Sequence, residues 1–198
     1  MASKKIILVT GANKGIGYEA VRQFAVAGHR VLLGARDPEK GISAVNKLHS
    51  SGLTNVSFLP LDVSNDQSVL QAVEAAKSAG VSHLDVLVNN AGIINESWGT
   101  AASQLSISKL RESFATNLEG VIRVTSAFLP LLKRNPTGHG RIINVSSTWG
   151  SLNALSTSIS SQVPSYHISK AALNTYTILL AQELKSQNIT VNSICPVS

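Results

Sequence analysis

Short apolar runs alternate with segments of helical period along the whole chain. The runs that predict strands are "KKIILVTG", "RVLLGAR", "VSFLPLDV", "LDVLVNN", "GRIINVSS" and "ITVNSICP". Between them, apolar residues at helical spacing predict helices over about 16–27, from Pro38, after Ser64, up to Arg134 as one long helix, and over about 166–185. This order implies parallel strands joined by right-handed crossovers, with strands that are apolar on both faces. We therefore expect an α/β fold with a doubly wound parallel sheet, in a single domain over residues 1–198.

Local signals refine two of these helices. Asp37 and Pro38 predict a capped helix start, and Ser64 precedes a polar first turn, as a cap shared with Asp62 would. The long helix carries a broad apolar face, mostly core, made of Phe114, Leu118, Val121, Ile122, Thr125, Phe128, Leu129 and Leu132. Any excess of that face would suit a second copy of the chain, as in a homodimer. The least regular segment is 148–165, between a strand and a helix, where such sheets form their ligand crevice.

Composition narrows the class of protein. With 198 residues, 43% of them hydrophobic, the chain can bury one substantial core. Its single cysteine, Cys195, allows no intrachain disulfide and no zinc framework, which is compatible with a reducing compartment; we expect a cytoplasmic protein. The run "IILV" is too short for a secretory signal, and no apolar stretch reaches membrane-spanning length. The net charge of +6 comes from scattered basic residues, which favours a small anionic ligand over nucleic acid.

A glycine-rich turn, "TGANKGIG", joins the first predicted strand to the first helix. Gly11 can make the tight exit from the strand, Gly15 lets the backbone approach a pyrophosphate, and Gly17 allows close packing of the helix on the sheet. The helix N-terminus would then face the phosphates. A plain glycine turn is the alternative, and the position between strand and helix favours a dinucleotide.

The residues after the second strand bear on which dinucleotide binds. A cofactor with a free ribose 2′-hydroxyl calls for an acid there, whereas this chain has Arg36, with Lys14 inside the glycine turn. Two cations favour a 2′-phosphate, hence NADP(H). Asp37 keeps NAD open as the ribose acid, although its place before Pro38 favours a helix cap.

Polar residues end the next two strands. Asp62 can accept a hydrogen bond from an adenine amino group, or can cap the following helix. The segment "NNAG", Asn89 to Gly92, combines amides with small residues that leave room for a cofactor; alone it would be a turn.

The segment "YHISK" places Tyr166 and Lys170 four residues apart, on one face of a helix. Alone this is no more than a surface pair. Together, "TGANKGIG", "NNAG", Asn117 in "FATNLEG", "INVSS" and "YHISK" resemble the short-chain dehydrogenase/reductase family over almost the whole chain, with a Rossmann-like fold. "TGANKGIG" with "GARD" is most similar to its NADPH-dependent carbonyl reductase branch.

The resemblance implies roles for individual residues. Tyr166 would be the general acid in carbonyl reduction, and Lys170 would lower its pKa from about 10 and hold the nicotinamide ribose. Ser147 would donate a hydrogen bond to the carbonyl oxygen, with Ser146 as the alternative, because neighbouring strand residues face opposite ways. Asn117, a poor helix former, would hold a water linked to the lysine. The implied cofactor-binding residues are Gly11, Asn13, Lys14, Gly15, Ile16, Gly17, Arg36, Asp62, Val63, Asn90, Ala91, Gly92, Tyr166 and Lys170.

Two aromatic residues near the expected site allow two interpretations. Trp149 and Trp98 either form apolar walls of a substrate pocket or pack on nearby helices as surface-loop aromatics. His167 faces another way on its helix, and we assign it no chemistry.

The family pattern continues beyond "VNSICP" with a glycine, a loop that contacts the nicotinamide, substrate-covering helices and a final strand. This chain ends at Ser198, so we expect the fold to lack them. The sequence therefore predicts reduction of a ketone or aldehyde of a small apolar molecule by NADPH. The alternatives are a weak or inactive NADP-binding protein and a dimerising protein without turnover.

Overall fold

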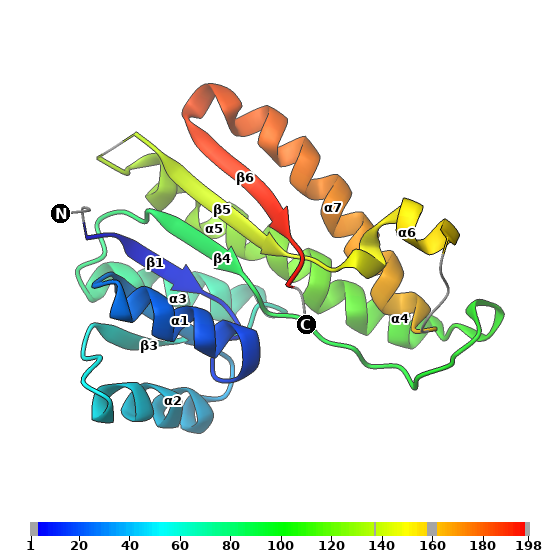
Figure 1. Cartoon of the computed structure of the whole chain (residues 1–198). Coiled ribbons are helices and arrows are strands. Elements are labelled where there is room, and N and C mark those ends of the chain that lie inside the picture. The colour runs from blue at the N-terminus through cyan, green and yellow to red at the C-terminus, as the bar shows by residue number, and fades with distance from the viewer. Residues whose placement is uncertain (1–3, 137, 158–161, 197–198) are drawn as a thin grey trace.

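A parallel sheet forms the centre of the protein (Figure 1). The structure, a computed structural model, describes residues 4–136, 138–157 and 162–196. Within these ranges six strands lie in the order β3-β2-β1-β4-β5-β6, and every neighbouring pair is parallel. Their bounds are β1 Ile6–Val9, β2 Arg30–Ala35, β3 Val56–Pro60, β4 Val86–Asn89, β5 Gly140–Val145 and β6 Ile189–Ile194. The predicted doubly wound α/β sheet is confirmed, and the order changes direction between β1 and β4.

Helices cover both faces of the sheet (Figure 1). Along β1, Ile7 and Val9 pack in one buried cluster with α1 and α2, while Leu8 packs in the other with α3, α5 and α7. Both sides of a strand are therefore apolar, as the sequence predicted. The helices are α1 Gly15–Val26, α2 Pro38–Ser50, α3 Asp66–Ser78, α4 Ile107–Phe114, α5 Gly120–Lys133, α6 Leu152–Thr157 and α7 Pro164–Leu184. None of the helices in the described ranges has the length and apolar character that crossing a bilayer requires.

The capping predictions have different outcomes at α2 and α3. Asp37 caps α2, because its side chain accepts a hydrogen bond from the Lys40 amide at 3.1 Å; this prediction is confirmed. The start of α3 is instead capped by Asn65, which accepts from the Ser68 amide at 2.9 Å. The cap predicted at Ser64, which is also the alternative role of Asp62, is therefore wrong.

The predicted long helix is divided into two. A π-helical turn, Ala115–Glu119, separates α4 from α5. Within α5 the predicted face is largely correct, since Val121, Thr125, Phe128 and Leu132 are buried, whereas Ile122 is 36% exposed. The segment after β5 is also more regular than predicted, because it contains a short 3-10 helix, Thr148–Gly150, and α6.

Candidate active site

Hydrogen bonds join the glycine-rich turn after β1 to the end of β4. The Thr10 hydroxyl accepts from the amides of Asn90, at 3.1 Å, and Ala91, at 3.0 Å. The Asn90 side chain donates to the carbonyl oxygens of Thr10, at 2.9 Å, and Gly11, at 3.1 Å. A side chain at Gly17 would collide with that same Asn90 amide, so α1 packs closely against this junction. Sequence reasoning missed this role of Thr10. The feature that could have indicated it is a hydroxyl residue directly after an apolar run of strand length, and in the structure Thr10 is buried.

Gly15 occupies a different environment at the start of α1. Its φ is +59°, which is costly for other residues, and a Cβ added there would meet nothing within 4 Å. The preceding residue, Lys14, makes no side-chain cap to the helix. The first turn of α1 is therefore open to an anionic ligand.

A cavity of about 590 Å³ lies along the carboxyl ends of the strands, beside this turn. Most of the predicted cofactor residues line it; Gly17, Tyr166 and Lys170 do not. The cavity also includes Asp37, which the sequence leaves open as a ribose acid. Residues that sequence reasoning did not assign to it are Lys40, Leu61, Ile93 and Thr116. The predicted residues in its lining are Gly11, Asn13, Lys14, Gly15, Ile16, Arg36, Asp62, Val63, Asn90, Ala91 and Gly92.

The charges at one end of the cavity are not balanced. The Asp37 carboxylate is engaged by Lys40, whose ammonium lies 2.8 Å away, and this hydrogen bond lowers the pKa of Asp37. Arg36 forms no ion pair with any residue that the structure describes. Asp62 uses one oxygen, Oδ1, to accept from the Ser64 amide at 2.9 Å and hydroxyl at 2.6 Å. Lys14 and Arg36 thus both line the cavity, and neither forms an ion pair with a described residue.

Tyr166 and Lys170 lie together on α7, close to the end of β5. The Lys170 ammonium is 5.5 Å from the centre of the Tyr166 ring and donates to the Val145 carbonyl at 2.8 Å. Lys170 is only 3% exposed, and burial lowers its pKa to about 8. Burial also raises the pKa of Tyr166, an effect that a hydrogen bond with Ser147 opposes. The expected lowering of the Tyr166 pKa by Lys170 is not seen here, and Lys170 is not among the groups that shift it.

The two neighbouring serines have different surroundings. The Ser147 hydroxyl contacts Tyr166 and accepts from the Trp149 amide at 3.2 Å. The Ser146 hydroxyl is buried and has no hydrogen-bond partner among the described residues. Only Ser147 is directed toward the tyrosine.

Asn117 lies in the π turn and is fully buried. Its side chain binds both backbone groups of Ile93, donating to the carbonyl at 3.0 Å and accepting from the amide at 2.8 Å. It also donates to the Ser169 hydroxyl on α7 at 3.0 Å. Asn117 therefore joins the segment after β4 to the helix that carries Tyr166, and its role in holding a water stays a prediction. A side chain at Gly92 would lie 3.4 Å from the Asn117 carbonyl oxygen.

Aromatic rings adjoin Tyr166. Trp149 meets the Tyr166 ring edge to face at 5.9 Å, and it meets the Trp98 ring in the same way at 5.6 Å. His167 stacks on Trp149 at 5.2 Å and is buried, with Nδ1 2.8 Å from the Val163 carbonyl. The tryptophans are thus part of the surroundings of Tyr166.

Comparison with known proteins decides the family. The family model for short chain dehydrogenases matches residues 5–198. The chain belongs to the short-chain dehydrogenase family. Among curated relatives, "Short-chain dehydrogenase anuI" of Penicillium roqueforti is 34% identical over 201 residues, covering 98% of this chain and 78% of the relative.

Solved structures of similar proteins have the same fold. NADPH-bound carbonyl reductase from chicken fatty liver superimposes with a TM-score of 0.87 at 30% identity, covering 98% of this chain and 79% of that one. The Pseudomonas aeruginosa RhlG/NADP complex gives a TM-score of 0.86 at 32% identity, covering 98% of this chain and 73% of that one. The protein in which Tyr166, Lys170 and Ser147 lie together is thus a member of an oxidoreductase family.

Proposed function

We propose that this short-chain dehydrogenase reduces a ketone or aldehyde of a small apolar molecule to an alcohol, with NADPH as the reductant. The observation that carries the proposal is the Tyr166 phenol beside the buried Lys170, whose ammonium lies 5.5 Å from the ring centre, with Ser147 near enough to lower the pKa of the phenol. A phenol and a neighbouring hydroxyl can together polarise and protonate a carbonyl oxygen.

The residues of the cavity fit a dinucleotide. Gly15 is open at the first turn of α1, where backbone amides suit a pyrophosphate. Arg36 and Lys14 suit a ribose 2′-phosphate, and Asp37 is already engaged by Lys40. We therefore favour NADP(H) over NAD, and the NADPH-bound and NADP-bound structural neighbours support this choice.

In the proposed reaction a bound NADPH would supply the hydride. Ser147 would donate a hydrogen bond to the carbonyl oxygen, and Tyr166 would give its proton to that oxygen as negative charge develops there. Lys170, with a pKa of about 8, exchanges protons near neutral pH from a position beside the Tyr166 ring. Asn117 would keep α7 in place against the segment after β4.

The test is the loss of NADPH absorbance with a panel of aromatic and aliphatic carbonyls. We expect turnover by the wild-type chain and a loss of at least about 100-fold in Tyr166→Phe, the scale of general acid catalysis. Tyr176→Phe is the matched control, because Tyr176 is a half-buried tyrosine on the same helix. NADPH binding without turnover of any carbonyl would contradict the proposal and favour a binding protein.

We also propose a homodimer, in the reducing environment of the cytoplasm. Large apolar side chains are exposed on two helices: Ile122 on α5, and Ile178 and Leu179 on α7, both 60% exposed. Sedimentation of the wild type and of Leu179→Glu tests the dimer, because a charge in an apolar interface should leave only monomer.

A further inference from the structure

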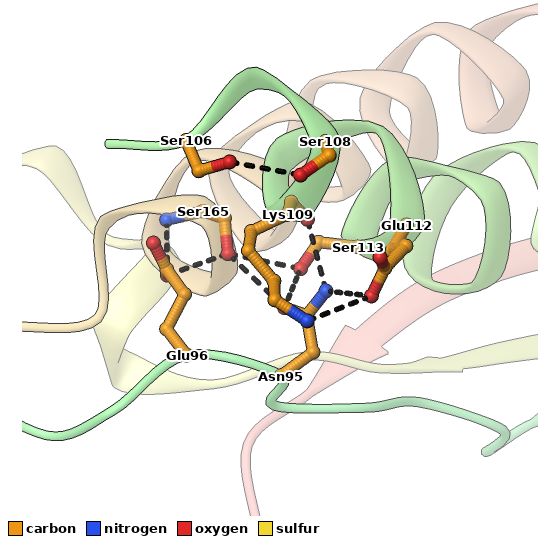
Figure 2. Close-up of polar contacts among 8 residues, drawn as sticks. All are labelled: Asn95, Glu96, Ser106, Ser108, Lys109, Glu112, Ser113 and Ser165. Atoms are coloured by element: carbon orange, nitrogen blue, oxygen red, sulfur yellow. Dashed lines mark hydrogen bonds and ion pairs between the residues drawn. The ribbon is translucent and has the colours of Figure 1, made fainter. Parts of the chain in front are cut away.

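The loop between β4 and α4 is attached to the start of α7, the helix that carries Tyr166. Figure 2 shows Glu96 reaching from this loop to Ser165, whose amide it binds at 2.7 Å and whose hydroxyl it binds at 2.5 Å. The N-cap residue of α7, Val163, makes no side-chain cap, and Pro164 has no N–H. Glu96 therefore supplies the acceptor, and the negative charge, that the start of this helix lacks.

The same loop is attached to α4. Figure 2 shows the Asn95 side chain between the two helices: it donates to the Lys109 carbonyl and to Glu112, both at 3.0 Å, and accepts from Ser113 at 2.8 Å. The Ser113 hydroxyl in turn lies 3.0 Å from that of Ser165. The loop is thus held at two successive residues before Trp98.

The residues after Trp98 are held as well. The amides of Gly99 and Thr100 both donate to the Gln162 carbonyl, at 3.0 and 3.1 Å, just before α7 begins. The Thr100 hydroxyl donates to the Ser97 carbonyl at 2.7 Å, across Trp98 itself. The backbone of Trp98 is therefore fixed on both sides relative to the helix that carries Tyr166.

Despite this fixed backbone, the Trp98 side chain is 64% exposed. Its ring meets Trp149 edge to face, and Trp149 meets Tyr166 in the same way while its own face is covered by His167. A large apolar ring in water, held one ring away from a reactive phenol, is a surface for a ligand.

We propose that Trp98, whose ring packs on Trp149, recognises a flat, aromatic part of the carbonyl substrate, so that aryl ketones and aldehydes bind better than saturated ones of the same size. This inference rests on the proposed carbonyl reduction at Tyr166. Ring pairs gain attraction from their edge and face charge distributions beyond the apolar area that they bury, and a saturated ring lacks this gain. The expected preference is about threefold to tenfold in dissociation constant, the size of that additional attraction.

The chain provides its own probe, because Trp98 and Trp149 are its two tryptophans. We would titrate the protein with acetophenone and with cyclohexyl methyl ketone in saturating NADP⁺, and without it, and follow tryptophan fluorescence. A ketone with the oxidised cofactor cannot be reduced, so this binding is measured independently of turnover. We expect acetophenone to bind about threefold to tenfold more tightly.

Variants locate the effect. Trp98→Leu should abolish the preference while leaving Trp149 as the reporter, and Trp98→Phe should retain most of it. Leu70→Ala, at a leucine on α3 that is 57% exposed, should change nothing. Equal binding of both ketones, no binding of either, or a preference that survives Trp98→Leu would overturn the inference. NADPH oxidation assayed in parallel separates the two proposals, since turnover without aromatic preference refutes only this one. Aromatic preference without turnover refutes only the reductase.

Discussion

The two ends of the sheet differ in how completely their buried polar groups are hydrogen-bonded. At the amino end, Asp85 precedes β4 and is only 4% exposed. Its carboxylate accepts from the Ile6 amide at 2.7 Å and the Asn135 side chain at 2.9 Å, and it lies 3.5 Å from His83. Each carboxylate oxygen there has a partner, and the bonds join β1, β4 and the end of α5.

The carboxyl end leaves such groups unpaired. Among the described residues, the buried side-chain atoms without a hydrogen-bond partner belong to β4, the loop that follows it, the end of β5 and α7: Asn89 Oδ1, Glu96 Oε1, Ser146 Oγ and Asn174 Oδ1. A buried ammonium, that of Lys170, lies in the same region. Unpaired polar atoms and buried charge cost stability, and native proteins retain them where ligands bind or chemistry occurs. The amino end therefore stabilises the sheet, whereas the carboxyl end carries a cost in stability, as binding and catalytic regions do.

The largest expected change in stability tests the amino end. Asp85→Ala leaves the Ile6 amide and the Asn135 side chain without their acceptor, so we expect the free energy of unfolding to fall by about 3 kcal/mol. Urea denaturation measures this, with Glu74→Ala as an exposed control of at most about 0.5 kcal/mol. Turnover per folded molecule should not change. Equal effects of the two substitutions would remove the stabilising role of this end.

The second prediction concerns Lys170, whose replacement should raise the free energy of unfolding rather than lower it. Burial lowers the pKa of Lys170 from 10.5 to about 8, so below pH 8 the folded protein carries the full cost of a buried charge. That cost declines as the pH rises from 8 to 10.5, where the unfolded chain still binds a proton and the folded one does not. After allowing for the lost bond to Val145, Lys170→Met should stabilise the protein by about 2 kcal/mol at neutral pH, and less above pH 8.

Turnover should be lost in the same Lys170→Met variant. Thermal unfolding at neutral pH and near pH 10 measures the stability change, with Lys77→Met on α3 as the exposed control that shows no such pH dependence. A destabilised Lys170→Met protein at neutral pH would show that the lysine is not a cost to the fold.

A smaller effect is expected at the start of α7. Glu96→Ala removes the acceptor for the Ser165 amide and should lower the free energy of unfolding by about 1 kcal/mol, as loss of a helix cap does. Because Tyr166 is the next residue, kcat should fall while KM for NADPH stays unchanged. Glu96→Gln, which keeps an acceptor, should lose less stability and less kcat than Glu96→Ala. Glu183→Ala, elsewhere on α7, should change neither stability nor kcat. A rise in KM for NADPH with kcat preserved would argue against a positioning role.

The smallest stability effect is expected at Arg36, at the exposed edge of the cavity. Arg36→Ala should change the free energy of unfolding by no more than about 0.5 kcal/mol. It should weaken NADPH binding about tenfold by removing a charge-assisted contact, and leave NADH binding unchanged. Isothermal titration with both cofactors measures this, and Arg134→Ala, at the end of α5, is the control. An equal loss for both cofactors would refute a 2′-phosphate contact.

Features set by local sequence could be predicted. Apolar runs of strand length gave the parallel sheet, and Asp37 with Pro38 gave the start of α2, because a cap involves only neighbouring residues. The residues of the cavity were predicted largely through a family resemblance, whose motifs occur in order along the chain.

Contacts between distant residues could not be predicted. The bonds of Thr10 to Asn90 and of Glu96 to Ser165 join segments 80 and 69 residues apart, and either partner alone is an ordinary polar residue in a loop or strand end. The π turn was also missed, because one extra residue in a turn leaves the apolar periodicity on each side intact.

That π turn has a consequence for helical phase. A turn with one more residue than an α-helical turn advances the following segment by about 100° around the helix axis. The extra residue lets α4 present one side to α7 while α5 presents another to the sheet, and it directs Asn117 inward where the two phases meet. Deletion of one residue within 115–119 would remove this difference in phase between α4 and α5. The protein would then lose either the packing of α4 on α7 and of α5 on the sheet, or the inward position of the Asn117 amide.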